Sequence, residues 1–393
     1  MDTLLTGVRV LDFGRYVAGP YCATLLAYLG ADVIRVEKAS GGEDRYIAPF
    51  PDSDGGALFL QTGCNKRSLA LDFRKPLSAE VLRRLLKTAD VVVANLPQAQ
   101  LQRLGLDWTA VHGLNPRVVL CTQTAFGNHG PLAAQGGFDG VAQAMSGAMY
   151  MTGTPGEPVK AAAPYVDFST AVLAAFGAMA ALLHREKTGL GQQVEGSLLG
   201  TALAAFGSHL AEQDALGLFR EPTGNRVQTS GPSDVFKTTD GHVLTHVVGR
   251  GIFQRCAALL GRGEWLDDPA LRSDQQRGDA RDRLCVAMAE WCALRSTSQA
   301  LDELSAAGVP AGPVLNLQQA LDHPQAGAMK WFENVRPPGR GRASRVPGLP
   351  LSFSALSAGI TRPPPGLGEH NRELLEELGF SRDEIDTLES ARN

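Results

Sequence analysis

The segment GVRVLDFGRYVAGPYCATLLAYLGADVIRVEK, residues 7–38, decides the fold. Its residues 8–13 are apolar and β-branched, and residues 31–36 return to a similar pattern, so both runs predict strands. The run between them, residues 20–28, has a helical pattern that Gly30 ends. A strand, a helix and a second strand of these lengths predict a β-α-β unit.

The turn inside this unit distinguishes it from nucleotide-binding folds that begin in the same way. A dinucleotide-binding fold also starts with β-α-β, and Glu37 falls near the place where that fold keeps its ribose-binding acid. The connection from strand to helix reads GRYVAGPY, which is neither G-x-G-x-x-G nor a P-loop. The sequence therefore disfavours nicotinamide and nucleoside triphosphate binding.

Strand and helix patterns keep alternating through the next part of the chain. They lie, in order, at 65–73, 77–87, 90–96, near Gln100 and at 117–127. Strands separated by helices of this length predict an α/β fold with a mostly parallel, Rossmann-like sheet. Ligands of such sheets bind beyond the carboxyl ends of the strands.

The later part of the chain predicts a smaller α+β domain, roughly residues 225–325. Residues 234–248 alternate in the manner of a hairpin, and helical segments follow them. Beyond this domain the chain is rich in Pro and Gly. It has strand-like pieces near 333–336 and 349–353 and a last helix at 373–379.

The composition is that of an ordinary globular protein. Hydrophobic residues make up 44% of the chain and charged residues 20%, and the formal net charge is −4, which disfavours nucleic acids and anionic membranes as partners. The six cysteines form no C-x-x-C pairs and have no nearby His ligands, so we expect buried, reduced thiols and no metal site. The first residues do not resemble a signal peptide, and the apolar run at 171–183 is too short to span a bilayer, so we expect a cytoplasmic protein with no membrane partner.

A single carboxylate, Asp167, stands at the start of a long apolar run within residues 161–192. Residues 169–183 are almost all Ala, Val, Leu, Phe, Met or Gly, which predicts a helix that is buried on all sides. Asp167 or Ser169 could simply cap this helix. Alternatively, the helix start holds a free carboxylate that meets a substrate and serves as a covalent nucleophile.

Taken together, several segments resemble the class III CoA-transferases, the CaiB/BaiF family. This family includes formyl-CoA:oxalate transferase and, as a divergent branch, α-methylacyl-CoA racemase. The resemblance covers nearly the whole chain. It rests on the segment quoted above and on CNKRSLALD, ADVVVANLPQAQLQRLG, GFDGVAQAMSG, PYVDFSTAVLAAFGAMAALLHREKTGLGQ, GVPAGPV and PPPGLGEHNRELLEELG.

The resemblance implies that Asp167 is the nucleophile. CoA would pass from an acyl-CoA donor to a small carboxylic acid acceptor through mixed anhydrides and an aspartyl-CoA thioester. CoA is then a substrate, and no prosthetic group or metal is implied. For Asp139 two interpretations stay open: it orients substrate or moves a proton, or it caps the helix that it starts.

The resemblance also implies a CoA-binding set. Its cations are candidates for the CoA phosphates, although each could equally be a solvated surface side chain. The set consists of Tyr16, Val17, Lys38, Leu71, Arg74, Asn95, Leu96 and Arg103. Lys66 and Arg67, in the NKRS motif, could instead pair with carboxylates, and Arg45 or Arg226 could clamp a substrate carboxylate.

The implied architecture is a large domain that both chain ends build, with residues 1–222 as its N-terminal part and residues 326–393 as its return segment, joined to the small domain at 225–325. An interlocked homodimer is implied as well. Racemisation of a 2-methylacyl-CoA is an alternative activity, but racemase-like members have a histidine near the position that Phe138 occupies, and the nearest histidine here is His129. A CoA-binding protein without turnover is a second alternative, which requires Asp167 to be occupied as a helix cap.

Overall fold

The computed structural model describes residues 3–339 and 341–389, which divide into two compact units. Unit 1 comprises the chain up to Ser146, Ala162–Leu210 and the chain from Pro324 onward. Unit 2 comprises Gly147–Ala161 and Ala211–His323. Segments from both ends of the chain therefore build unit 1.

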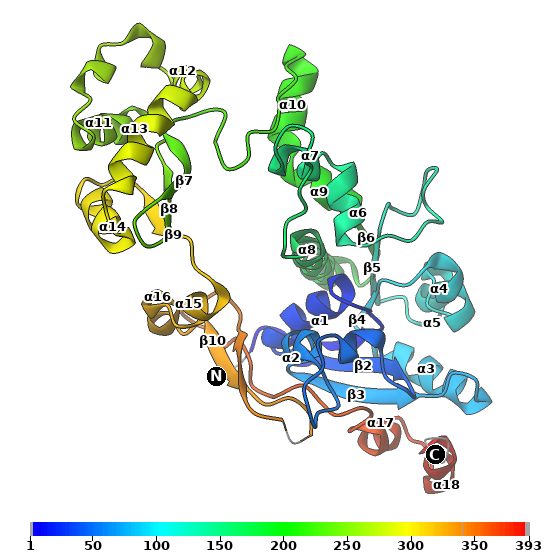
Figure 1. The fold of residues 1–393 in the computed structure, drawn as a ribbon. Helices are drawn as coiled ribbons and strands as arrows, with labels where there is room; N and C mark the ends of the chain where they lie inside the picture. The colour runs from blue at the N-terminus through cyan, green and yellow to red at the C-terminus, as the bar shows by residue number, and fades with distance from the viewer. Residues whose placement is uncertain (1–2, 340, 390–393) are drawn as a thin grey trace. The chain divides into compact units, whose positions relative to one another are not determined.

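Unit 1 is organised around a six-stranded sheet in the order β3-β2-β1-β4-β5-β6 (Figure 1). Every neighbouring pair in it is parallel, which confirms the α/β prediction. The strands are β1 (Arg9–Asp12), β2 (Asp32–Lys38), β3 (Lys66–Leu71), β4 (Val91–Ala94), β5 (Val119–Thr124) and β6 (Gln193–Ser197). The chain order reverses between β1 and β4, and ligands of open α/β sheets bind at such a switch point.

Helices cover both faces of this sheet because its strands are buried on both sides. One apolar core lies between the sheet and α3 (Pro76–Thr88), α4 (Gln98–Leu104), α5 (Trp108–Leu114), α17 (Asn371–Glu377) and α18 (Arg382–Glu389). The other core lies between the sheet and two helices, α1 (Ala18–Tyr28) and α8 (Tyr165–Thr188). Further helices of unit 1 are η1 (Glu43–Tyr46), α2 (Ala57–Thr62), α6 (Asp139–Met145) and α9 (Leu198–Ala205).

Helix α8 is long and apolar, but in the single chain it is not buried on all sides as predicted. Ala171, Ala174 and Ala178 recur at helical spacing and pack into the core. On the opposite face, the side chains of Phe176 and Leu183 are 71% and 65% exposed. An all-apolar sequence gives no sign of which face meets the sheet, and small alanines allow the closer approach. By length and composition α8 would also qualify as a membrane span, a test that core helices of soluble proteins pass too.

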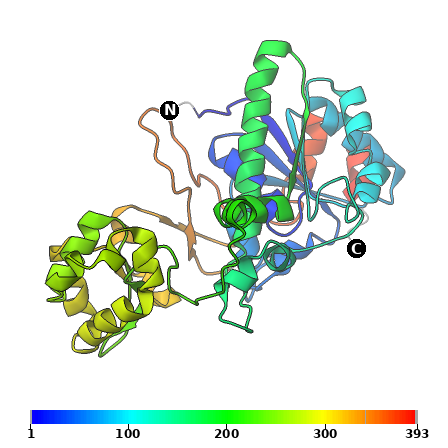
Figure 2. The ribbon, with the colours of Figure 1, turned by 90° about the horizontal axis from the view of Figure 1, so that it is seen from above.

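Unit 2 contains the predicted hairpin, formed by β7 (Ser233–Lys237) and β8 (His242–His246). Residues 308–313, expected only to connect, contribute a third strand, β9 (Ala311–Pro313), which pairs with β8. The apolar core of this unit, in the yellow-green part of Figure 2, joins the sheet to α11 (Arg250–Leu259), α13 (Arg281–Ala293) and α14 (Thr297–Ala306), and α12 (Asp274–Asp279) packs against α13. Shorter elements are α7 (Ala148–Thr152), η2 (Gly263–Leu266), η3 (Pro269–Leu271) and α15 (Leu317–Leu321), and α10 (Gly207–Leu216) begins in unit 1.

The C-terminal segment returns to unit 1 through α16 (Pro324–Ala328) and a second hairpin of β10 (Phe332–Val335) and β11 (Ser344–Pro347). Residues 349–353 do not form the predicted strand, because Pro350 has no N–H to donate to the hydrogen-bond ladder of a sheet. Helix α17 then lies against β3, where the Asn371 side chain accepts from the Ala70 N–H and donates to the Ala70 carbonyl. All six cysteines are buried and free, as predicted.

Candidate active site

Asp167 lies in the first turn of α8 with an unoccupied side chain. The residue at the N-cap is Pro164, so neither Asp167 nor Ser169 caps the helix, and the capping hypothesis is wrong for both. Among the described residues, none donates a hydrogen bond to the Asp167 carboxylate, which is partly buried. A carboxylate with no structural contact is available to a substrate.

Asp139 supplies the cap that α8 lacks. One carboxylate oxygen, Oδ2, accepts the Val166 N–H at 2.8 Å and the Asp167 N–H at 3.1 Å. Its other oxygen accepts from the Gln143 side chain, and the residue is only 6% exposed. Asp139 does not cap its own helix, whose N-cap is Phe138. It fixes the backbone that carries Asp167.

The environment of Asp167 disfavours its charged form. Burial, and then the neighbouring charge of Asp139, raise the pKa of Asp167 to about 6. At neutral pH the carboxylate is still mostly ionised, but it is incompletely solvated. A poorly solvated anion is a better nucleophile than one in bulk water.

The topology brings Asp167 to the carboxyl edge of the sheet. Helix α8 leads into β6, which is parallel to β5, so the start of α8 lies near the ends of these strands (Figure 1). Asp139 follows β5 and lies at the same edge. The predicted CoA-binding residues follow the ends of the neighbouring strands: Tyr16 and Val17 after β1, Lys38 at the end of β2, Leu71 and Arg74 at and after β3, and Asn95 and Leu96 after β4, with Arg103 in α4.

The three predicted cations of this set are at the surface. Lys38 forms an ion pair with Glu43 at 2.8 Å, and Arg74, whose side chain is 91% exposed, pairs with Asp72 at 2.9 Å. Arg103 is exposed and has no ion pair within the described part of the chain. All three are therefore accessible to a phosphate, and Lys38 and Arg74 would exchange their present carboxylate partners for it.

The apolar members of the set are core side chains. Val17 and Leu96 are each 6% exposed, and Leu71 is 2% exposed. Their side chains therefore have little exposed surface with which to contact a nucleotide. Asn95 is engaged with the backbone of Arg15, so its side chain already has a structural role.

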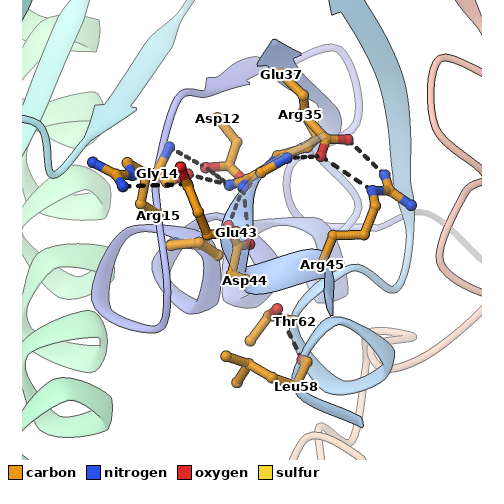
Figure 3. Close-up of polar contacts among 12 residues, drawn as sticks. Asp12, Gly14, Arg15, Arg35, Glu37, Glu43, Asp44, Arg45, Leu58 and Thr62 are labelled. Carbon is orange, nitrogen blue, oxygen red and sulfur yellow. Dashed lines mark hydrogen bonds and ion pairs between the residues drawn. The ribbon is translucent and has the colours of Figure 1, made fainter. Parts of the chain in front are cut away.

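Beneath this edge lies a buried cluster of charges that sequence reasoning did not identify (Figure 3). Arg35 forms two hydrogen bonds to Asp44, at 2.9 and 2.8 Å, and Lys66 contacts Asp12 at 2.8 Å. Burial alone would raise the pKa of Asp12, but the Lys66 and Arg35 charges hold it below its usual value. The signal in the sequence was the charged residues at buried positions in VRVLDF and VIRVEK.

Other cations proposed from the sequence are structural. Arg45 is fully buried, pairs with Glu37 at 2.5 Å and lies over the Phe59 ring, so the proposal that it clamps a substrate is wrong. Arg226 pairs with Asp234 at 2.9 Å. Arg67 pairs with three carboxylates, those of Asp32, Glu373 and Glu377. Lys66 and Arg67 therefore pair with carboxylates, which was one of the interpretations of the NKRS motif.

A hollow of about 240 Å³ lies between α8, β6 and α9. Thr170, one turn along α8 from Asp167, is part of its lining, and Asp167 is not. Within residues 3–339 and 341–389 there is no group of three His, Cys, Asp or Glu side chains that could hold a metal ion.

Comparisons with known proteins show which sequences and folds this chain resembles. The family model described as CoA-transferase family III matches residues 5–371. The chain is 32% identical to the succinyl-CoA–D-citramalate CoA-transferase of Chloroflexus aurantiacus, over 99% of this chain and 97% of that protein. It is also 32% identical to the formyl-CoA:oxalate CoA-transferase of Streptomyces avermitilis, over 99% of each chain. The crystal structure of a CaiB/BaiF family protein from Brucella suis matches 96% of this chain and all of its own, with 30% identity and a TM-score of 0.83.

Proposed function

Because the chain belongs to CoA-transferase family III and is a CoA-transferase, we propose that it moves CoA from an acyl-CoA to a carboxylic acid through covalent intermediates on Asp167. The observation that carries this proposal is the Asp167 carboxylate itself. It stands in the first turn of α8 and accepts no hydrogen bond from any described residue, while the neighbouring Asp139 holds the backbone N–H groups of that turn. The positioning role and the reactive role thus fall to different carboxylates.

The proposed reaction is a series of acyl transfers. An Asp167 oxygen attacks the donor thioester carbonyl, the C–S bond breaks, and a mixed anhydride and CoA thiolate form. The thiolate attacks the aspartyl carbonyl, which releases the donor acid and leaves an aspartyl-CoA thioester. The acceptor carboxylate attacks this thioester to give a second mixed anhydride, and the thiolate then takes the acceptor acyl group and frees Asp167.

Every step of this series exchanges one anion for another. A carboxylate or thiolate enters, another leaves, and no proton has to be moved, so no acid/base pair is required. This agrees with an Asp139 whose two oxygens are already engaged. Each tetrahedral intermediate needs donors for its oxyanion, which backbone N–H groups supply in other acyl-transfer enzymes.

For CoA binding we propose the exposed cations Lys38, Arg74 and Arg103 as partners of its phosphates. All three follow the same edge of the sheet, and two of them are held in exposed ion pairs that water already weakens. Tyr16 follows β1 in the chain and offers a partly exposed ring to the nucleotide or pantetheine.

The two alternative functions have less support. Racemisation needs a base near the α-carbon, and the residue next to Asp139 is Phe138, an exposed aromatic. A CoA-binding protein without turnover would need Asp167 as a helix cap, and that role is taken by Asp139. Incubation with a 2-methylacyl-CoA in deuterated water, without an acceptor acid, would reveal a racemase by incorporation of deuterium.

The names of the relatives direct the choice of substrates. Citramalate and oxalate, which appear in these names, are short dicarboxylic acids, and succinyl-CoA is the thioester of a third. We therefore propose a small dicarboxylic acid as the acceptor. The test is a panel of succinyl-, acetyl- and formyl-CoA donors against such acids, with wild type and Asp167→Ala. We expect transfer by the wild type and none by the variant. Equal transfer by Asp167→Ala would refute the nucleophile.

We further propose that the protein is an interlocked homodimer. Its support within unit 1 is the exposed apolar face of α8, where Val172, Phe176 and Leu183 are each more than half exposed. Apolar side chains gathered on one helix face mark a protein interface more often than free surface.

A further inference from the structure

The turn that follows β1 has an unusual backbone. Tyr16 has a φ of +60°, a left-handed conformation that residues with side chains rarely adopt. Two glycines make this turn possible. A Cβ on Gly14 would lie 2.6 Å from Pro20, and a Cβ on Gly19 would lie 2.8 Å from the Gly14 Cα and 3.0 Å from the Asn95 Oδ1. The turn is thus packed directly against the side chain that follows β4.

The Asn95 side chain holds this turn by binding both polar backbone groups of Arg15. Its Oδ1 accepts the Arg15 N–H at 2.6 Å, and its Nδ2 donates to the Arg15 carbonyl at 2.8 Å. These bonds cross the switch point between β1 and β4, where the strand order reverses. They fix the residue immediately before the left-handed Tyr16.

The buried charge cluster holds the same turn from below (Figure 3). Asp12 accepts the Gly14 N–H at 2.8 Å, and the Arg35 guanidinium donates to the Gly14 carbonyl. Both side chains are 2% exposed or less. With Asn95, they engage every backbone polar group of Gly14 and Arg15.

The turn in this form places the Tyr16 ring against the elements that carry the nucleophile. The rings of Tyr16 and Phe138 meet edge to face, with centroids 5.3 Å apart. Phe138 directly precedes Asp139, which holds the first turn of α8. Contacts therefore run without a break from Asn95 to the backbone of Asp167.

We propose that Asn95 is a positioning residue: it locks the Gly14–Tyr16 turn so that Tyr16 braces Phe138 and Asp139 beside Asp167. This inference rests on the proposed function and differs from the direct CoA contact that the sequence implied for Asn95. A positioning residue affects the reacting geometry in the transition state, whereas a ligand of CoA affects ground-state binding.

The first test compares Asn95→Ala with Asn115→Ala. Asn115 is a matched control, since its side chain also makes hydrogen bonds on both sides, donating to the Leu86 and Ala89 carbonyls and accepting from the Arg117 N–H, before the start of β5 at the opposite edge. We expect Asn95→Ala to lower kcat about ten- to hundredfold with little change in the KM for acyl-CoA, while Asn115→Ala leaves both constants near wild type. A raised KM at unchanged kcat would overturn the proposal in favour of direct CoA contact. An equal loss in both variants would reduce it to a general stability effect.

A double-mutant cycle tests the route. If Asn95 acts through Tyr16 and Phe138, the losses from Asn95→Ala and Phe138→Ala overlap, and the double variant is less impaired than their product predicts. Losses that multiply would contradict this route.

A measurement that does not depend on CoA transfer separates this proposal from the proposed function. With 3-fluorotyrosine at position 16, the ¹⁹F shift of the folded protein reports the ring beside Phe138. We expect Asn95→Ala to move it towards the shift of the Phe138→Ala variant and Asn115→Ala to leave it unchanged. If the wild type transferred no CoA, the proposed function would fail while this measurement still decided the role of Asn95; an unmoved signal in Asn95→Ala would refute that role.

Discussion

At the scale of single residues, two neighbouring aspartates have separate tasks. The Asp139 carboxylate is buried and saturated with donors, and the Asp167 carboxylate is partly exposed and accepts no bond from the described chain. The closeness of the two charges contributes to the raised pKa of Asp167. This coupling makes the ionisation of Asp167 measurable in the pH dependence of the reaction.

We expect the transfer rate to rise with pH around a midpoint of about 6, because the nucleophile must be ionised. Asp139→Asn keeps an oxygen acceptor for the α8 N–H groups but removes the neighbouring charge, so the midpoint should move to lower pH. Asp107→Asn is the matched control, because Asp107 caps α5 at 3.2 Å and lies in another helix. A midpoint that stays at about 6 in Asp139→Asn would contradict the coupling between the two carboxylates.

The same raised pKa predicts a stability effect. The pKa of Asp167 is higher in the folded state than in the unfolded state, where it is about 3.9, so the folded protein binds more protons between these values and loses stability as pH rises through them. Asp167→Asn should therefore be more stable than wild type at pH 7.5, by about 1–3 kcal/mol, and nearly equal to it at pH 4. Urea unfolding at both pH values measures this. A variant that is less stable at pH 7.5 would indicate that Asp167 has a structural partner.

At the scale of elements, the return of the C-terminal segment to the sheet depends on Arg67. This guanidinium extends from β3 to Glu373 and Glu377 of α17, each at 2.6 Å, and also pairs with Asp32 of β2. Its side chain is 8% exposed, so little water can replace these partners. The cluster therefore attaches the last helices to the edge strand.

Arg67→Ala should lower the free energy of unfolding by about 1–3 kcal/mol, because the three partly exposed carboxylates then keep only Arg9, which pairs with Asp32 and Glu377. Arg67→Ala should also speed hydrogen exchange in α17 and α18, relative to wild type, more than it speeds exchange in β1. The control is Arg83→Ala, which breaks an exposed pair with Glu80 on α3 and should leave exchange unchanged. Equal protection of α17 in all three proteins would contradict the attachment.

The elements were largely predictable from the sequence, whereas the contacts between them were not. Parallel strands are continuous apolar runs, so β1, β2, β4 and β5 could be located from the sequence alone. The face of α8 that meets the sheet could not be predicted, because an all-apolar helix has no polar face that would mark its solvent side. The bonds that organise the site join residues 28 positions apart for Asp139 and Asp167 and 80 apart for Asn95 and Arg15, far beyond any local period.

At the scale of the whole molecule, the exposed apolar face of α8 is a feature that the single chain does not explain. Phe176 is 71% exposed although it lies on the longest apolar helix of the described chain. Composition alone could not have indicated a dimer, because the residues that cover a core and those that cover a partner are of the same kind.

We expect Phe176→Glu to yield a folded monomer, because a charge at the centre of an apolar interface would have to be desolvated. Sedimentation velocity would give the oligomeric state and circular dichroism the fold. Arg74→Glu, at a 91% exposed side chain after β3, is the control and should remain a dimer. A wild type that sediments as a monomer would refute the dimer directly.

The central claim is that Asp167 bonds covalently to the substrate. The most direct measurement is incubation with succinyl-CoA and hydroxylamine, which converts an aspartyl anhydride or thioester to a hydroxamate, followed by mass spectrometry of the peptide that contains residues 161–185. We predict a hydroxamate on Asp167 in wild type and in Asn115→Ala, only when acyl-CoA is present. Transfer of CoA with an unmodified Asp167 peptide would contradict the account.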